Sequence, residues 1–428
     1  MTTGAEGKKR SRVVSGMRPT GRLHIGHYFG ALENWVRLQN DPTYECFYFI
    51  ADWHALTSDY ADTSGVAGNT IEIMTDYLAA GLDPEKSVIF QQSLVPEHAE
   101  LHLLLSMVTP LSWLERVPTY KEALEQVKDK DLHNYGFLGY PCLQTADIVI
   151  YSEEGTALFV PVGEDQVSHV ELSREIVRRF NTFYGFELDF SISDSENLGH
   201  VGFIRAKLGL PAEELRPPRN IGEMLVPIHH SDIEPAARRR AQQIGWDNFI
   251  REMSESCRFF HCGQKLTEPG VMLTKTPRIP GLDGRKMSKS YGNAITLSET
   301  DEEIRKKTKV MVTDPARKRR TDPGNPDVCP VYDWHKLFST QGTLAWAAEG
   351  CRTAGIGCIE CKAKMADHLI AWIAPVRERR VKWENDKKSV VEMIDAGSKK
   401  ARVEAQKTME RVREAVFHWK DKRAEIGV

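Results

Sequence analysis

The stretch Arg12-Val-Val-Ser-Gly-Met-Arg-Pro-Thr-Gly-Arg-Leu-His-Ile-Gly-His27 decides the fold of this chain. It begins with a short β-type run, is interrupted by Pro19 and Gly21, and leads into a helical pattern of apolar residues that continues to Leu38. We therefore expect a strand, a tight turn and a helix in direct succession. Such a helix start suits a phosphate group, because its backbone N–H groups are unpaired and the positive end of its dipole lies there.

The following segments repeat this order. Residues 46–50 form a continuous apolar run, which is typical of a parallel strand buried on both faces, and a helix is expected around residues 71–80. Residues 87–92 predict a third strand. Strands that alternate with helices favour an α/β fold with a doubly wound parallel sheet, whose ligand site lies at the carboxyl ends of the strands.

The composition is that of a globular protein. The chain has 428 residues, of which 41% are hydrophobic and 27% charged, and this length suggests two or three domains. No stretch has the roughly 18 apolar residues of a membrane helix, and the N-terminus lacks the apolar region of a secretory signal, so we expect a cytoplasmic protein. Eight cysteines are too few for a disulfide scaffold, and clustered cysteines in a reducing compartment indicate metal binding or catalysis.

The net charge of −3 conceals an asymmetry along the chain. Residues 301–428 carry a formal charge of +7, whereas residues 1–300 carry −10. A basic C-terminal part suits a polyanionic partner, although solvated helix faces account for the charge equally well. Apolar residues at helical spacing, namely Met409, Val412, Val416 and Trp419, predict that this part is helical.

Two short motifs indicate nucleotide chemistry. His24-Ile-Gly-His27 places two histidines on one helix face, where they can donate to phosphate oxygens, and Gly26 leaves room for an adenine ring. Lys286-Met-Ser-Lys-Ser290 follows a Gly- and Pro-rich loop at 277–285, so its lysines can close over a triphosphate and neutralise charge as pyrophosphate leaves. Taken singly, the motifs are also compatible with ordinary helix-start histidines and a solvated basic loop.

Together, the two motifs and the α/β pattern between them resemble the signature pair of the class I aminoacyl-tRNA synthetases. Within that class, the stretches at 15–21, 140–151 and 160–166 resemble the bacterial tryptophanyl-tRNA synthetases, and the resemblance covers roughly 1–185 and 270–428. It implies a ligase that activates L-tryptophan with ATP and Mg²⁺, transfers it to tRNA(Trp), and works as a homodimer in the cytoplasm.

The resemblance also implies a domain organisation. A Rossmann-like catalytic domain would comprise residues 1–186 and 266–300, and a helical anticodon-binding domain would comprise residues 301–428. Residues 187–265 depart from the family pattern and would form an inserted module. Its role is left open between tRNA contacts, a partner surface and regulation.

By the same resemblance, Asp147 would accept the N–H of the tryptophan indole, a ring that has one donor and no acceptor. The other residues expected around the amino acid are Gln144, Tyr140, His54, Gln166 and Gly16. His24, His27, Lys286 and Lys289 would be catalytic. ATP would be bound by Arg18, Pro19, Thr20, Gly26, His27, Gly163, Glu164, Asp165, Ile279, Lys286, Met287, Ser288, Lys289 and Ser290.

Two other functions stay open. A tyrosyl-type synthetase shares the fold and both signatures, and Gln144 departs from the Met that many tryptophanyl enzymes have at that position, although a bacterial subgroup also has Gln. A synthetase-like protein that has lost charging could act as an RNA-binding or redox-responsive regulator. The intact motifs argue against the regulator, whereas the long insertion weakly favours an additional function.

Four cysteines predict a metal centre in the C-terminal part. Cys329, Cys351, Cys358 and Cys361 leave intervals of 21, 6 and 2 residues, and such spacing can bring four thiolates to one zinc ion or cluster. The stretch 349–361 resembles a subset of bacterial tryptophanyl-tRNA synthetases that bind a [4Fe-4S] cluster, which we therefore expect in preference to zinc. The adjoining basic set of Arg317, Lys318, Arg319, Arg320 and Arg352 would lie along the tRNA backbone.

A second metal site inside the inserted module is a weaker possibility. Its ligands would come from Cys257, His261 and Cys262 together with His229 and His230. Because His261 and Cys262 are adjacent in the chain, they cannot easily both face one ion.

Overall fold

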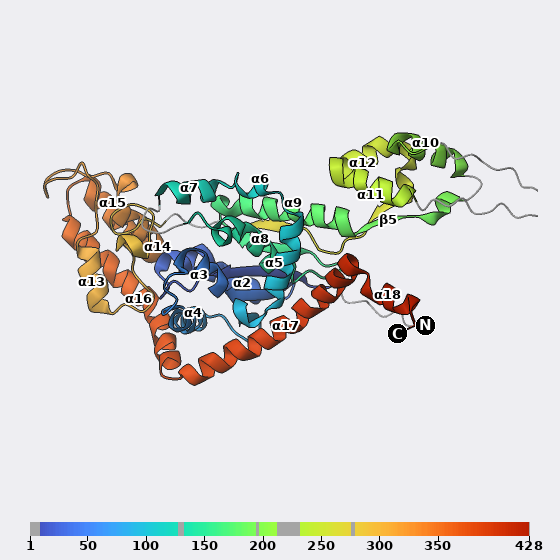
Figure 1. Ribbon diagram of the computed structural model, residues 1–428. Helices are drawn as coiled ribbons and strands as arrows, with labels where there is room; N and C mark the ends of the chain where they lie inside the picture. The colour runs from blue at the N-terminus through green and yellow to red at the C-terminus, as the bar shows by residue number, and fades with distance from the viewer. Residues whose placement is uncertain (1–8, 127–131, 194–196, 212–231, 275–278, 428) are drawn as a thin grey trace, which may run out of the picture.

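The computed structural model describes residues 9–126, 132–193, 197–211, 232–274 and 279–427. Within them, a parallel five-stranded sheet in the order β3-β2-β1-β4-β7 forms the centre of the molecule (Figure 1). Its strands are β1 (Ser11–Met17), β2 (Tyr44–Ile50), β3 (Val88–Gln91), β4 (Leu158–Val162) and β7 (Pro269–Leu273). The predicted α/β fold with a doubly wound sheet is thereby confirmed, including the strands expected at 46–50 and 87–92.

Helices connect the successive strands. The short α1 (Ile25–His27), the π-helical turn η1 (Tyr28–Leu32) and α2 (Glu33–Gln39) follow β1, and α3 (Asp52–Asp59) and α4 (Val66–Ala80) follow β2. Five further segments, η2 (Gln92–Leu94), α5 (Glu97–Val108), α6 (Leu111–Leu114), α7 (Pro118–Gln126) and α8 (Tyr135–Val149), lead to β4. After β4 come η3 (Glu164–Gln166) and α9 (Val167–Tyr184).

Both faces of the sheet are covered by helices, and the strand sequences show why. Val13 and Val14 are consecutive in β1 and therefore point to opposite faces. Val13 belongs to a core cluster with Trp35 and Tyr48, and Val14 belongs to a second cluster with Phe47. A strand whose two faces are both buried needs the continuous apolar sequence that β2 has.

The segment after α9 has a core of its own. The strands β5 (Phe186–Leu188) and β6 (Phe260–Cys262) pair in an antiparallel manner where the chain enters and leaves this segment. Between these strands lie η4 (Phe190–Ser193), α10 (Leu198–Leu208), α11 (Ile233–Ile244), α12 (Trp246–Met253) and η6 (Ser254–Phe259). A separate apolar cluster that includes Ile204, Ala237 and Phe249 fills this part, which stands apart from the sheet (Figure 1).

The C-terminal part is helical, as predicted. After η7 (Lys289–Tyr291) it comprises α13 (Asp301–Lys309), η8 (Pro326–Val328), α14 (Pro330–Phe338), α15 (Gln341–Arg352), α16 (Cys358–Glu384), α17 (Lys387–Phe417) and α18 (Trp419–Glu425). Trp419 begins a separate helix, α18, because His418 is left-handed with φ of +50° and the chain turns there. Trp419 is 62% exposed.

The long helix α17 lies along the edge strand β3 (Figure 1). A Cβ atom on Gly397 would stand 1.8 Å from the carbonyl oxygen of Ile89, so only glycine permits this approach. The next residue, Ser398, accepts the N–H of Gln91 at 3.2 Å through its hydroxyl. The helix thus covers an edge that would otherwise present unpaired backbone groups.

Across the described ranges, no helix is both long enough and apolar enough to cross a membrane.

Candidate functional site

The first motif begins helix α1 at the carboxyl end of β1. His24 is the N-cap residue, and its backbone N–H donates to Nδ1 of His27 at 3.2 Å. The two rings stack with their centroids 3.6 Å apart. A Cβ on Gly26 would come within 2.9 Å of the His24 ring, so glycine at this position keeps that ring in place.

Both histidines are neutral at physiological pH. Burial, followed by the nearby Lys289 ammonium, lowers the pKa of His24 to about 4. Burial likewise lowers the pKa of His27 well below its ordinary value, with smaller contributions from His24 and Lys289. Because Nδ1 of His27 accepts a hydrogen bond, its ring proton resides on Nε2, where it is available to a ligand.

The second motif meets the first through Lys289. Its Nζ donates to the carbonyl oxygens of Thr20 at 2.7 Å and Arg22 at 3.0 Å, so the side chain lies against the turn that leads to α1. This turn contains Gly21 with φ of +95°. Burial lowers the pKa of Lys289, whereas Asp76 opposes that shift.

The backbone joins the two motifs a second time. The N–H of Ile25 donates to the carbonyl oxygen of Ile295 at 3.0 Å, and the N–H of Leu297 donates to the carbonyl oxygen of Leu23 at 2.8 Å. Residues 295–297 follow the lysine-rich loop by only a few positions. The start of α1 and the end of that loop therefore form one hydrogen-bonded unit.

A buried carboxylate lies at the carboxyl end of the sheet. Asp147 in α8 is fully buried, and Nε2 of His54 lies 2.8 Å from its Oδ2 while Nδ1 of His98 lies 2.7 Å from its Oδ1. The side-chain amide of Gln92 donates to both carboxylate oxygens at 2.8 Å. His98 also bonds through Nε2 to the hydroxyl of Tyr151 at 2.8 Å.

Asp147 is ionised in spite of its burial. Burial alone would raise its pKa, but the hydrogen bonds from His54 and His98 outweigh this effect and lower the pKa to about 2. Sequence reasoning named Asp147 and His54 but missed Gln92, His98 and Tyr151. Sequence position gave a partial signal, because Gln92 directly follows β3 at the binding edge and Tyr151 ends the family-like stretch 140–151, whereas His98 lies between Glu97 and Glu100 without such a mark.

The other residues predicted to surround the amino acid differ in burial and in hydrogen bonding. The hydroxyl of Tyr140 lies 2.9 Å from Nε2 of His169, and Gln144 and Gln166 are half-buried. Gly16 is exposed on its strand, and a Cβ there would stand 2.6 Å from the ring of Phe49.

The residues predicted to bind ATP fall into three groups. Ile279, Met287 and Pro19 are buried, and the first two belong to the apolar core. Gly163 and Ser288 are half-buried. Arg18, Thr20, Glu164 and Lys286 are exposed, and the side chains of Asp165 and Ser290 lie outside the described residues.

The four cysteines of the C-terminal part lie near one another. Cys329 caps α14, Cys351 lies in the last turn of α15, and Cys358 and Cys361 lie in the first turn of α16. Burial, and then the charges of the other three thiols, raise the pKa of Cys361 to about 12. In the part of the chain that is described, no three His, Cys, Asp or Glu side chains are arranged to hold a single metal ion.

One member of the adjoining basic set differs from its neighbours. Arg317 is buried, and its Nη2 donates to the carbonyl oxygen of Ile356 at 2.5 Å. It therefore does not lie on the surface where a tRNA backbone was expected. The remaining members are exposed, namely Lys318, Arg319, Arg320 and Arg352.

The second metal site considered for the module gains no support. His229 and His230 lie outside the described residues. His261 and Cys262 are consecutive in strand β6, so their side chains point to opposite faces, and the described His, Cys, Asp and Glu residues show no grouping for a metal ion there.

Comparisons with known proteins identify relatives of this arrangement. The sequence model of the family described as tRNA synthetases class I (W and Y) matches residues 6–194 and 247–373. The tryptophan–tRNA ligase of Ralstonia nicotianae is 48% identical over 410 residues, covering 95% of this chain and 98% of that protein. The ligase of Thermotoga maritima with the same name is 44% identical over 406 residues, covering 95% and 98%.

A solved structure shares the fold over nearly the whole chain. It is tryptophanyl-tRNA synthetase from Campylobacter jejuni complexed with ADP and tryptophan, at 26% identity and a TM-score of 0.66. The match covers 95% of this chain and 99% of that one.

The lowered pKa of His24 predicts an acid sensitivity. Between pH 6.5 and pH 4, the unfolded chain takes up a proton at His24 that the folded chain does not bind, so stability falls as the pH falls through this window, by up to about 3 kcal/mol. His24→Asn, which can still cap α1, should lose less stability over the same range. Urea unfolding of both proteins at pH 7, 6, 5 and 4.5 measures the difference, and parallel pH curves would contradict the prediction.

Proposed function

This chain belongs to the class I tRNA synthetases of the tryptophan and tyrosine family, and we propose that its site joins L-tryptophan to tRNA(Trp) as a tryptophan–tRNA ligase. The enzyme activates L-tryptophan with ATP, forming tryptophanyl-adenylate and pyrophosphate, and then transfers the acyl group to the tRNA. This function rests on the contact between the two signature motifs, in which Lys289 donates to the turn at residues 20–22. The chain is also 48% identical to a tryptophan–tRNA ligase over nearly its full length.

ATP would lie over the start of α1. The neutral rings of His24 and His27 can donate to phosphate oxygens, and the unpaired N–H groups of the helix start favour the same charge. Lys289 would leave the carbonyl oxygens of Thr20 and Arg22 for the phosphates, and the exposed Lys286 would join it. Mg²⁺, when it accompanies ATP, neutralises part of the phosphate charge.

Tryptophan would be selected by Asp147. A carboxylate has about four lone-pair sites, and His54, His98 and Gln92 occupy them when no ligand is present. The side chain of His54 is 12% exposed whereas that of His98 is fully buried, so the indole N–H would replace His54 on Oδ2. His98 and Gln92 would keep the carboxylate ionised and fixed. The remaining lining would come from Gln144, Tyr140, Gln166 and Gly16.

The decisive experiment charges a bulk tRNA pool with labelled tryptophan or tyrosine. We expect tryptophan alone to be esterified, and Asp147→Asn to raise the KM for tryptophan by roughly 10- to 100-fold, the cost of losing a charged hydrogen bond, with the KM for ATP unchanged. Charging with tyrosine would leave the fold assignment intact and refute the pocket. Absence of charging with either amino acid would favour the RNA-binding or redox-responsive regulator. We further propose that the enzyme works in the cytoplasm, as the family resemblance implies.

We also propose that Cys329, Cys351, Cys358 and Cys361 hold a [4Fe-4S] cluster. The charges of the three other thiols act on Cys361, and a Cβ on Gly324 would reach within 2.7 Å of Sγ of Cys351, so glycine keeps this thiol accessible. The four cysteines come from the starts of α14 and α16 and the end of α15, and the resemblance of residues 349–361 to cluster-binding relatives favours the cluster over zinc.

The charges around the cysteines support the same assignment. Four thiolates and a cluster carry net negative charge, which is costly inside a protein without a cation. The buried Nε of Arg317 hydrogen-bonds to no described residue, and its guanidinium acts on Cys351. Lys362 experiences the charges of Cys358, Cys329 and Cys361. When bound, the cluster would link α14, α15 and α16 covalently.

Anaerobic purification tests the cluster. The protein should be brown, absorb broadly in the visible range, and contain about four iron and four sulfide ions per chain. Cys351→Ser should lose the colour, whereas the control Cys257→Ser, in the inserted module, should keep it. Stoichiometric zinc without iron would overturn the cluster.

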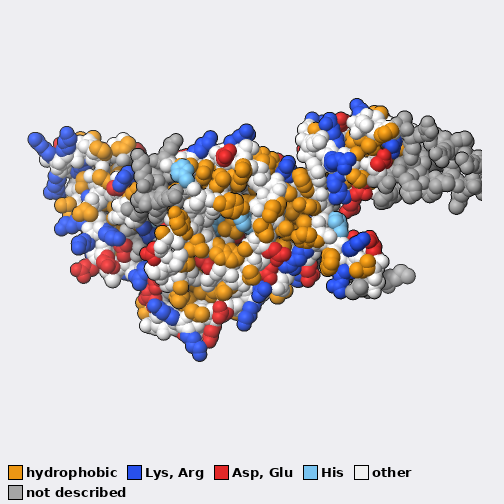
Figure 2. All heavy atoms as spheres, viewed as in Figure 1, with side chains coloured by type: hydrophobic (Ala, Val, Ile, Leu, Met, Phe, Trp, Pro, Cys, Tyr) orange, Lys and Arg blue, Asp and Glu red, His pale blue; other side chains and the backbone are white. Residues whose placement is uncertain are grey.

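Two chains are proposed to form the working enzyme. Three large apolar side chains are exposed on neighbouring helices, Leu103 at 53%, Met107 at 70% and Leu111 at 60%. Figure 2 shows hydrophobic side chains gathered over the region of α5, α6 and α8. Contiguous exposed apolar surface of this kind favours a protein interface, and a second copy of the chain is the occupant that the family implies.

Substitution at this surface tests the dimer. Met107→Glu places a charge in the apolar patch and should shift the mass in sedimentation from two chains toward one. The control Glu171→Gln changes an exposed residue on α9 and should leave the mass at two chains. A wild-type mass of one chain at micromolar concentration would refute the proposal.

A further inference from the structure

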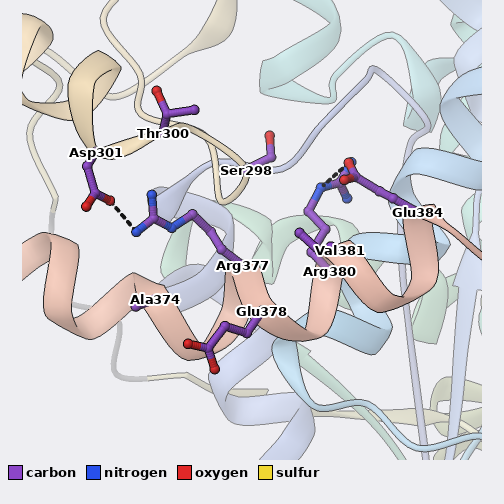
Figure 3. A pocket seen from close by; sticks show the side chains of 9 residues that line it. All are labelled: Ser298, Thr300, Asp301, Ala374, Arg377, Glu378, Arg380, Val381 and Glu384. Atoms are coloured by element: carbon purple, nitrogen blue, oxygen red, sulfur yellow. Dashed lines mark ion pairs between the residues drawn. The ribbon is translucent and has the colours of Figure 1, made fainter.

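Helix α16 reaches from the cysteines to the ATP site. Its first turn carries Cys358 and Cys361, and its last three turns carry Arg377 and Arg380. Both arginines line a cavity of about 450 Å³ between α16 and the strap of residues 295–301 that follows the lysine-rich loop. Figure 3 shows Arg377 reaching across this cavity to Asp301, while Arg380 pairs with Glu384 on its own helix.

Arg380 is buried within a group of acidic side chains. Its side chain is 2% exposed, and Nη1 donates to Oδ1 of Asp76 at 2.5 Å. Nη2 pairs with Glu72, and Nε lies 3.1 Å from Oε1 of Glu384. Asp76 and Glu72 belong to α4, so Arg380 joins the C-terminal helix α16 to α4 by a buried ion pair.

Asp76 also contacts the backbone next to the first motif. Its Oδ2 accepts the N–H of Leu23 at 2.6 Å, and Leu23 directly precedes His24. Leu23 in turn accepts from Leu297 in the strap. A chain of contacts therefore runs from Arg380 through Asp76 to the residue at which α1 begins.

The strap is held from the same helix. Arg377 pairs with Asp301 and donates to the carbonyl oxygen of Glu299 at 3.0 Å. Arg22 bridges the two parts, since it pairs with Glu72 at 3.0 Å and donates to the hydroxyl of Ser298 at 3.2 Å. The start of α1 and the strap are thus both fixed to α4 and α16.

We propose that Arg380 is a positioning residue for adenylate formation, which holds the start of α1 and its two histidines at the ATP phosphates through Asp76. This inference rests on the proposed function, because the reaction positioned is the one assigned there. Misplacement of a phosphate-binding helix by a fraction of an ångström lowers the rate without removing any group that touches the substrate.

The electrostatics of Asp76 support this role. Burial raises its pKa to about 6, and the Arg380 guanidinium is the largest influence that opposes the rise. Without Arg380, the pKa of Asp76 would rise further, which favours the neutral carboxyl group. A neutral carboxyl group is a weaker acceptor for the Leu23 N–H than a carboxylate, so the start of α1 would loosen.

The experiment compares two neighbouring arginines in the full-length protein. Arg380→Met removes the buried pair, whereas Arg379→Met removes a hydrogen bond of 2.7 Å from Nε to the carbonyl oxygen of Ala79, between the same two helices, and leaves the Arg380–Asp76 pair intact. We measure ATP-dependent pyrophosphate exchange, tryptophan binding, and deuterium uptake of the peptide covering residues 20–27.

Arg380→Met should lower kcat/KM for ATP in exchange by about tenfold or more, leave the Kd for tryptophan within about twofold, and increase deuterium uptake at residues 20–27. Arg379→Met should leave all three at wild-type values. Exchange kinetics or deuterium uptake in Arg380→Met equal to those of Arg379→Met would overturn the proposal.

Two further measurements keep the test decisive. If Arg380→Met does not fold, Arg380→Gln removes the charge but keeps a hydrogen-bond donor beside Asp76, and exchange at the wild-type rate in that variant would refute the role. If the wild-type protein shows no exchange at all, the proposed function fails, while the deuterium uptake still decides whether Arg380 holds the start of α1.

Discussion

The structure depends on carboxylates that are taken out of water and paired inside the molecule. Asp76 is the clearest case: it is fully buried, and its two oxygens hold Arg380 of α16 and the backbone N–H of Leu23. Leu23 directly precedes α1, Asp76 lies in α4, and Arg380 lies in α16, so the three residues come from distant parts of the chain. An unpaired buried charge costs several kcal/mol, so the three segments are constrained to meet in one arrangement.

Asp147 shows how the same residue type serves a different purpose when its partners differ. Both aspartates are fully buried, yet the pKa of Asp76 is raised to about 6 and that of Asp147 is lowered to about 2. Burial raises the pKa of both carboxyl groups. The hydrogen bonds from His54 and His98 outweigh burial at Asp147, whereas Arg380 and the Leu23 N–H do not outweigh it at Asp76, where Glu72 adds to the rise. Asp147 is suited to bind a ligand N–H at any physiological pH, and Asp76 is suited to hold structure.

The sequence predicted the features that periodicity and spacing encode. Continuous apolar runs revealed the buried strands, and the two signature motifs identified the side chains that the structure brings together at Lys289. Gln92 and His98 lie among other polar residues, namely Gln91, Ser93, Glu97 and Glu100, and no periodicity separates those that face the site from the rest. Arg380 was equally hidden, because α16 and α17 contain many basic residues and burial of one of them is set by packing against α4. Arg317 was placed on the surface for the same reason, since its basic neighbours are exposed.

The contact of α17 with β3 has a consequence for synthesis on the ribosome. Gln91 and Ser398 are 307 residues apart in the chain, so at ordinary translation rates roughly 15 to 60 seconds pass between the emergence of the strand and that of the helix that covers it. During this interval the edge of the sheet has open backbone groups that another strand could pair with. The short length of β3, four residues, limits how strongly a foreign strand can bind there. A nascent chain truncated before α17 would keep this edge open, and it would be a substrate for chaperones rather than a smaller version of the enzyme.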